Sequence, residues 1–191
     1  GSEMCIRDSI GVRFRLPASM NQVEYFGRGP AENYLDRNAG SMIGLYKSTA
    51  EELYFPYVRP QENGHHTDTR WVSLSTGKKG LLIQADNTIG FNALRNSIED
   101  FDDEEATGLP RQWSNFTPEQ VANHDEAAAK SVLRRQHHIN DITPRDFVEV
   151  CVDLKQQGVA GYDSWGSRPE PAYTLPANRE YNWGFTLIPL K

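Results

Sequence analysis

Side chains of the types that bind or catalyse are concentrated between Pro56 and Trp71, in the run PYVRPQENGHHTDTRW. Asn63-Gly64 predicts a turn, because both residues tolerate a positive φ. Arg59 and Glu62 precede this turn with opposite charges. The prolines of the run remove backbone donors, so we expect neither a regular helix nor a central strand here. Two interpretations follow: a rigid corner between strands held by arginine–carboxylate pairs, or one wall of a binding site.

A second run, GRGPAENYLDR, begins at Gly27 and again combines a turn with opposite charges. Its charged and amide side chains are Arg28, Glu32, Asn33, Asp36 and Arg37. The two carboxylates, Glu32 and Asp36, are spaced to pair with Arg28 or Arg37. We therefore interpret this run as a structured loop held by ion pairs, in preference to a catalytic centre.

The third candidate is a tryptophan in a loop, Trp165, which stands in the run Asp163-Ser164-Trp165-Gly166. Glycines and prolines flank the run, so ordinary burial in a strand is not expected. An aromatic ring in such a loop can stack on the apolar face of a sugar. The alternative is that Trp165 closes one end of the fold by packing.

The histidines and cysteines form no recognisable metal or nucleophile motif. Neighbouring residues on a strand point to opposite faces, so neither His65-His66 nor His137-His138 is a ready bidentate metal site. We expect structural histidines, either hydrogen-bonded or exposed. Cys5 and Cys151 are the two cysteines, and they suggest no disulfide framework. The sequence also lacks a nucleophile elbow and a phosphate-binding glycine loop.

The elements that must position these residues are mostly short strands. Residues 147–154 (FVEVCVDL) alternate strictly, with Val148, Val150 and Val152 on one apolar face. The other predicted strands cover residues 10–16, 22–26, 41–47, 71–74, 81–85, 91–94, 172–175 and 181–188. One helix is predicted at 117–130, where Thr117 fits the N-cap and Pro118 the first helical position. Many short strands with one short helix indicate an all-β antiparallel sandwich.

Composition places the chain among globular proteins with one sizeable domain. It has 191 residues, of which 38% are hydrophobic and 24% charged. A net charge of -6 without a basic stripe argues against nucleic acid as a partner. No apolar run approaches the roughly 18–20 residues that span a bilayer, so we expect no membrane partner. Residues 1–9 look like a leader or remnant, which leaves 10–191 as the domain.

Together, three runs in this order resemble a known family. They are YFGRGPAENYLDR, LYFPYVRPQENGHHTDTRW and GYDSWG. The series resembles the C-terminal, small-chain domain of β-galactosidases of glycoside hydrolase family two, and the likeness runs from Ile10 to the end. Family members often have GGDDSWG before the tryptophan, whereas Ala160 and Tyr162 are substituted here. The resemblance implies an antiparallel two-sheet supersandwich of the galactose-mutarotase type.

The resemblance also implies which residues face the sugar. Trp165 matches a family tryptophan that this domain lends to the substrate site, with Asp163 and Ser164 beside it. From the proline-rich run, it implies that Arg59, Glu62 and Asn63 lie toward the substrate. The members of the other motif would shape the domain face structurally; they are Arg28, Glu32, Asn33, Asp36 and Arg37.

The activity implied by the resemblance belongs to a larger protein. Both catalytic glutamates of the family sit in a preceding (β/α)-barrel domain, so this chain would be inactive alone, as part of a retaining enzyme that hydrolyses terminal β-D-galactosides such as lactose. The implied partners are the galactoside and that barrel, and the parent is expected to be a homo-oligomer. No cofactor is expected in this chain, because any magnesium and sodium of the parent would be bound in its barrel.

Three other functions are compatible with the residues. One is a free-standing carbohydrate-binding module that uses the Trp165 loop and the corner at Arg59–Asn63. Another is a mutarotase-like epimerase with Glu62 and either His65 or His66 as acid and base. The last is a structural piece that caps the barrel and builds subunit contacts.

Overall fold

The computed structural model describes residues 9–58, 61, 63–101, 139–162 and 167–191. Contacts divide the chain into two compact units. The first comprises Gly1–Phe55, Asn63–Arg95 and Arg145–Lys191, and it contains every strand described below. The second comprises Pro56–Glu62 and Asn96–Pro144. None of the helices within the described ranges has the length and hydropathy needed to cross a membrane.

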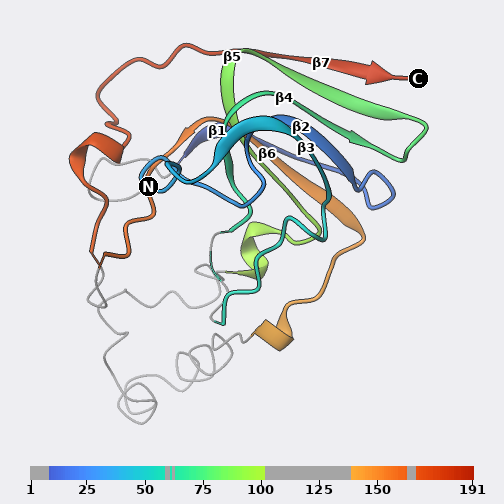
Figure 1. The fold of residues 1–191 in the computed structure, drawn as a ribbon, viewed down its shortest axis with the longest axis horizontal. Coiled ribbons are helices and arrows are strands. Elements are labelled where there is room, and N and C mark those ends of the chain that lie inside the picture. The colour runs from blue at the N-terminus through green and yellow to red at the C-terminus, as the bar shows by residue number, and fades with distance from the viewer. Residues whose placement is uncertain (1–8, 59–60, 62, 102–138, 163–166) are drawn as a thin grey trace, which may run out of the picture. The chain divides into compact units, whose positions relative to one another are not determined.

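The first unit is built on one seven-stranded antiparallel sheet, shown in Figure 1. The strand order is β1-β6-β5-β4-β2-β3, and β7 pairs with β5. The strands are β1 (Ser9–Pro17), β2 (Gln22–Gly29), β3 (Met42–Thr49), β4 (His66–Ser75), β5 (Gly80–Leu94), β6 (Phe147–Gln156) and β7 (Phe185–Leu190). This confirms the all-β antiparallel class predicted from the sequence. The predicted helix at 117–130 lies outside the described residues.

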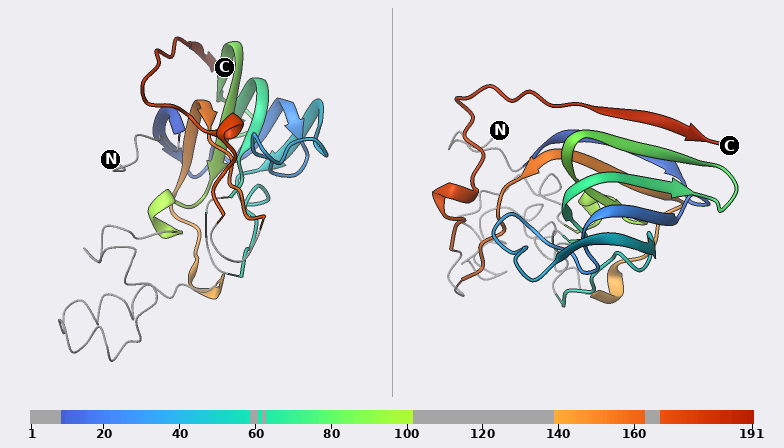
Figure 2. Two further views of the ribbon diagram at one scale, coloured as in Figure 1. Left: turned by 90° about the vertical axis from the view of Figure 1, so that its left-hand side faces the viewer. Right: turned by 45° about the horizontal axis from the view of Figure 1, so that its top comes forward.

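The long strand β5 holds the sheet together because it has two different neighbours on one edge. Its residues 80–85 pair with β7, and its residues 90–94 pair with β6. The opposite edge pairs with β4 along most of this length. Figure 2 shows β7 running alongside the first part of β5. Strands from the middle and the end of the chain are thereby joined through β5.

The core lies on one face of the sheet, where strand alternation places apolar side chains in rows. Register sets Val72 between Tyr25 and Ile83, and none of these three side chains is more than 1% exposed. On β6, the predicted apolar face is confirmed, because Val148, Val150 and Val152 are fully buried. The other face of β6 is buried as well, since Glu149 is 3% exposed.

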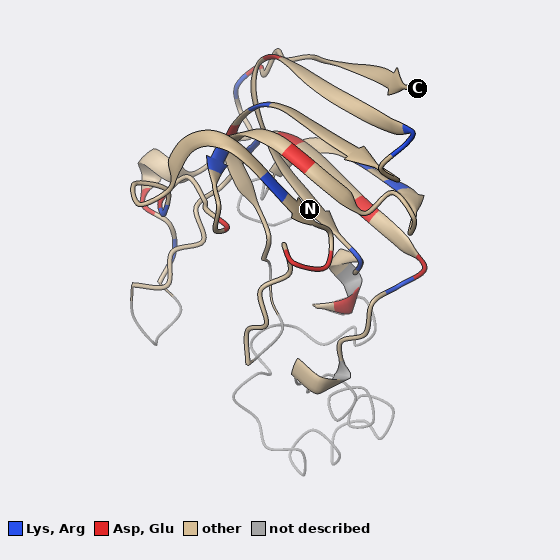
Figure 3. Ribbon diagram, turned by 45° about the vertical axis from the view of Figure 1, so that its right-hand side comes forward, with Lys and Arg blue, Asp and Glu red and all other residues tan. Residues whose placement is uncertain are grey.

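Charge on the first unit is spread rather than gathered by sign. Figure 3 shows basic and acidic segments interspersed over the described ribbon. The buried Glu149 on β6 is matched by two arginines of β1, with Arg15 Nε at 2.9 Å and Arg13 Nη1 at 3.6 Å from its carboxylate oxygens. This pairing offsets the cost of burying a carboxylate.

In the second unit, the described residues include two short 3₁₀ helices, Ile98–Asp100 and Ile139–Asp141. The backbone N–H of Ser97 donates to Asp100 Oδ2 at 2.8 Å, which closes the first of these turns. Asn96 Nδ2 donates to the Thr143 carbonyl at 3.0 Å. This hydrogen bond ties the described segment 96–101 to the described segment 139–144.

Three local predictions need correction. Residues 172–175 were expected to form a strand, but a 3₁₀ helix begins at Pro171, whose missing N–H suits a first helical position better than a strand. The last strand begins at Phe185, later than expected. The run from Pro56 to Trp71 is irregular only up to His65, because β4 begins at His66. An irregular register between His66 and Trp71 masks the alternation in the sequence.

Candidate functional site

The two motifs singled out in the sequence pack against each other in the first unit, and Asn33 is the residue that joins them. Its backbone N–H donates to the His65 carbonyl at 2.7 Å. Its Oδ1 accepts from the Thr67 backbone N–H at 3.0 Å and from Thr67 Oγ1 at 2.6 Å. Asn33 is fully buried, so these bonds replace water for both partners. The interpretation as a rigid corner therefore describes this part of the chain.

Glu32 makes the second link between the motifs. Its Oε2 accepts from the Gly64 backbone N–H at 2.6 Å, and its Oε1 lies 3.1 Å from Arg37 Nη2. Gly64 has the positive φ expected from the sequence, 75°, although no regular turn is assigned at Asn63-Gly64. A Cβ at Gly64 would lie 2.8 Å from Leu94 Cδ2. This position therefore needs glycine both for its backbone conformation and for the close approach of Leu94.

Arg28 makes the third link, with the strand that follows the corner. Its Nε donates to Asp68 Oδ2 at 2.5 Å, and its Nη1 donates to the Ser41 carbonyl at 2.8 Å. Asp68 itself has a φ of 51°, which lies in the left-handed region that is uncommon for residues other than glycine. The guanidinium of Arg28 thus connects its own strand β2 to Asp68 on β4 and to Ser41 in the loop before β3.

The two histidines are buried and hydrogen-bonded, as the sequence led us to expect for structural histidines. Each side chain is 1% exposed. His65 Nδ1 lies 2.7 Å from Asn92 Oδ1, and Asn92 Nδ2 donates to the Asn63 carbonyl at 2.6 Å. Because Asn92 Oδ1 can only accept, His65 Nδ1 carries the proton. Burial lowers the pKa of His65 to about 4. His65 is thus neutral at pH 7.

His66 sits among aromatic rings and backbone carbonyls. Its ring stacks on Phe91 with centroids 5.1 Å apart and meets Tyr25 edge-on at 4.9 Å. Its Nδ1 lies 3.0 Å from the Gly64 carbonyl and its Nε2 3.3 Å from the Pro30 carbonyl. Burial lowers the pKa of His66 despite these acceptors. Neither histidine is placed to exchange protons with a ligand from solvent, which argues against the epimerase alternative.

Asp36 connects the first motif to the loop that carries the tryptophan. Its carboxylate accepts from the backbone N–H groups of Val159 at 3.1 Å and Ala160 at 2.8 Å. A Cβ at Gly158 would lie 2.4 Å from Asp36 Oδ2, so glycine permits this approach. Beyond it, the Tyr162 backbone N–H donates to Ser167 Oγ at 3.0 Å. The described residues on the two sides of 163–166 are therefore joined by a hydrogen bond.

The predicted site residues are only partly described. Trp165, Asp163, Ser164, Arg59 and Glu62 lie outside the described residues, so their substrate contacts stay predictions. Asn63 is 2% exposed, and its Oδ1 accepts from the Phe55 backbone N–H at 3.2 Å. The motif residues Arg28, Glu32, Asn33, Asp36 and Arg37 all lie in the first unit, and each has a hydrogen-bond partner there.

Sequence reasoning missed two contributors to this arrangement. Asn92 completes the support of His65 from near the end of β5, where an asparagine gives no pattern that predicts such a role. The reach of Asp36 to residues 159 and 160 spans more than 120 positions, and no spacing rule covers such a distance. Among the described residues, no group of three or more histidine, cysteine, aspartate or glutamate side chains could hold a metal ion.

Comparison with known proteins yields one family and several long relatives. The family model described as beta galactosidase small chain matches residues 7–187. A beta-galactosidase of Priestia megaterium is 35% identical over 182 residues, which are 95% of this chain and 14% of that relative. A beta-galactosidase of an Arthrobacter species is 40% identical over 97 residues, covering 48% of this chain and 10% of the relative. A third, from Vibrio cholerae, is 28% identical over 93% of this chain and 14% of its own length.

Proposed function

The chain belongs to the beta galactosidase small chain family, and from that premise we propose that it works as the C-terminal β-sandwich domain of a larger enzyme that hydrolyses terminal β-D-galactosides such as lactose. The observation that carries the proposal is the family match over residues 7–187. The relatives named as beta-galactosidases support it, since this chain corresponds to only 14% of the Priestia megaterium protein. Most of the machinery of such an enzyme would then lie in other domains.

In this proposal the domain supplies one wall of the sugar site. Trp165 stacks on the apolar face of the sugar, with Asp163 and Ser164 beside it. Arg59 and Glu62 belong to the surface that meets the substrate side of the enzyme, whereas Asn63 is buried and acts through its hydrogen bond with the Phe55 backbone. Support comes from Asp36, whose carboxylate binds the backbone just before the tryptophan loop. A loop held at its base presents an aromatic ring at little entropic cost.

The bond-breaking chemistry is assigned to a preceding barrel domain. Retaining hydrolysis needs two carboxyl groups roughly 5 Å apart, one as nucleophile and one as acid and base. We propose that both belong to the barrel, that magnesium and sodium are bound there, and that the parent forms homo-oligomers. This chain alone is then inactive. Its own contribution is to orient the galactoside and to exclude water from one side of the site.

The first test is an assay of the purified chain on a chromogenic β-galactoside, together with calorimetric titrations of galactose and lactose. We expect no turnover and no saturable binding, since one wall alone holds a sugar weakly. Saturable millimolar binding without turnover would favour the carbohydrate-binding module instead. Turnover that survives repurification would overturn the assignment of both carboxylates to another domain.

The second test replaces Trp165→Ala in a full-length enzyme that contains this domain. We expect KM for the galactoside to rise about fivefold to tenfold, because stacking of an aromatic ring on the sugar is worth about 1–1.4 kcal/mol. The control is Trp183→Ala, whose ring packs on Phe185 at 5.4 Å inside the first unit. Equal effects of the two variants on KM and on thermal stability would indicate a purely structural role for Trp165.

A further inference from the structure

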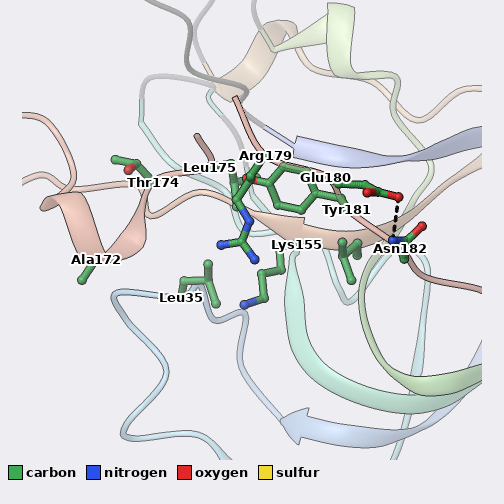
Figure 4. A pocket seen from close by; sticks show the side chains of 10 residues that line it. Leu35, Lys155, Ala172, Thr174, Leu175, Arg179, Glu180, Tyr181 and Asn182 are labelled. Atoms are coloured by element: carbon green, nitrogen blue, oxygen red, sulfur yellow. Dashed lines mark hydrogen bonds between the residues drawn. The ribbon is translucent and has the colours of Figure 1, made fainter. Parts of the chain in front are cut away.

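A small cavity in the first unit lies where the end of β6 meets the segment before β7. It has a volume of about 260 Å³, and it is lined by Leu35, Lys155 and residues between Ala172 and Asn182. Leu175 is 3% exposed and supplies an apolar wall. Figure 4 shows the cavity from close by, with side chains from three separate segments around it. Its volume suits a compact ligand rather than an extended chain.

Two cationic side chains, both exposed to solvent, line this cavity. In Figure 4 the guanidinium of Arg179 and the ammonium of Lys155 are directed toward the same space. Across the described part of the chain, no salt bridge to a carboxylate is recorded for either of them. Two like charges directed at one space repel each other, and a bound anion would reverse that repulsion.

The acidic side chain of the cavity is engaged elsewhere. Glu180 Oε1 accepts from Asn182 Nδ2 at 3.0 Å, and Figure 4 shows this pair on the side away from the two cations. Glu180 therefore does not fill the space between Lys155 and Arg179. The cavity keeps a local excess of positive charge in a chain whose formal net charge is -6. Because the protein as a whole is acidic, it does not attract anions in general, so anion binding here would have to come from the cavity itself.

Arg179 is also oriented by its neighbours before any ligand arrives. Its guanidinium lies over the Tyr181 ring, 4.9 Å from the centroid. The Tyr181 hydroxyl donates to the Pro176 carbonyl at 2.9 Å, which fixes that ring. A planar guanidinium stacked on a fixed ring keeps its edge N–H groups available for two parallel hydrogen bonds.

We propose that this cavity is a binding site for a small oxyanion, a carboxylate or a phosphate group carried by a compact molecule. Arg179 binds two oxygens of the group in the bidentate manner, and Lys155 contributes a point charge from the opposite segment. The apolar wall at Leu175 and Leu35 contacts the rest of the molecule. None of the residues that line the cavity is among the sugar contacts proposed above, and binding here can be detected without galactoside hydrolysis.

The test is calorimetric titration of the purified chain with inorganic phosphate and, separately, with D-glucuronate as a compact carboxylate. Sodium chloride at equal ionic strength controls for screening, and neutral D-glucose controls for binding of the sugar ring alone. We expect saturable binding of at least one oxyanion in the millimolar range, with neither control binding. Which of the two probes binds, phosphate, glucuronate or both, identifies the kind of oxyanion that the site accepts. Signals equal to those of sodium chloride for both probes would overturn the proposal.

Variants make the assignment specific. Lys155→Gln or Arg179→Gln should each weaken binding about tenfold, because each removes a charge-assisted hydrogen bond. Arg179→Lys keeps the charge and should retain part of the affinity. The matched control is Lys79→Gln, an exposed cation in the turn before β5, which should bind as the unaltered chain does. Circular dichroism of each variant checks the fold. Binding unchanged in both Gln variants at the cavity would place the site elsewhere and contradict the proposal.

Discussion

Hydrogen bonds fix the positions of several buried polar side chains in this protein. His65 and Asn33 are both polar and both almost completely buried. Each is satisfied by partners from another strand or loop, as buried polar groups must be. Such residues fix one arrangement of the corner, because any shift would leave a buried donor or acceptor unpaired.

His65 gives the stability of the chain a predictable dependence on pH. Its pKa is lowered to about 4 in the folded protein, against 6.5 usually. Between these values the unfolded chain binds a proton that the folded chain does not. Stability should therefore be independent of this group above pH 6.5 and should fall between pH 6.5 and pH 4, by at most about 1.4 kcal/mol per pH unit.

The measurement has two parts. Urea unfolding at pH 7, 6 and 5 gives the slope, and histidine-selective ¹⁵N NMR gives the state of the ring. We expect the His65 ring to remain neutral at pH 5 in the folded chain and to titrate near pH 6.5 in concentrated urea. A folded-state titration near pH 6.5 would mean that the ring is not buried as described.

At the scale of elements, the turn before β4 depends on Gly64 for two reasons that can be separated. Gly64→Ala meets both a φ of 75° and a contact of 2.8 Å with Leu94 Cδ2. Gly77→Ala meets only a φ of 82°, because nothing lies within 4 Å of its Cβ position. We expect Gly77→Ala to cost about 1 kcal/mol and Gly64→Ala about 1–3 kcal/mol more, measured by urea unfolding. Equal costs would show that Leu94 relaxes freely.

The loop that follows β6 depends on Asp36. Removing its carboxylate in Asp36→Ala leaves the N–H groups of Val159 and Ala160 without their acceptor. We expect amide exchange of these two residues to accelerate about tenfold or more, because each loses a charge-assisted hydrogen bond. The control is Asp146→Ala, an exposed carboxylate just before β6. Unchanged exchange at both amides would show that Asp36 does not hold the backbone of residues 159 and 160.

Sequence reasoning succeeded where a pattern is local and failed where a partner is distant. The alternation of 147–154 predicts β6 because every second residue is apolar, and the hairpin of β4 and β5 follows from the turn at 76–80. By contrast, β5 extends through Asp86 and Asn87, which do not favour strands. Its length is explained by pairing with both β6 and β7, which no local pattern shows.

The same distinction holds for the site. The residues of the two motifs were identified because they are close in sequence and unusual in type. That Asn33 joins His65 and Thr67, and that Asp36 holds the segment after β6, depends on contacts made only after folding. Lys155 and Arg179 were missed because a lysine and an arginine in separate segments are ordinary surface residues until the sheet brings them to one cavity.

At the scale of the whole molecule, β3 leaves an apolar edge on the first unit. It is an outer strand of the sheet, and Met42, Ile43 and Leu45 on it are 70%, 43% and 59% exposed. An edge strand with exposed apolar side chains and unpaired backbone groups promotes association. We therefore expect the isolated chain to self-associate reversibly, with an associated fraction that increases with protein concentration.

Sedimentation velocity over a hundredfold range of concentration tests this expectation. Leu45→Lys should shift the chain toward the monomer, because a charge on the edge strand must be desolvated when a second strand pairs there. Val159→Lys is the matched control: Val159 is 37% exposed but lies in the loop after β6 and not on β3. If both variants reduce association equally, general charge repulsion explains the effect. If Leu45→Lys alone reduces it, β3 is the contact, and in a longer enzyme this edge would require a covering segment.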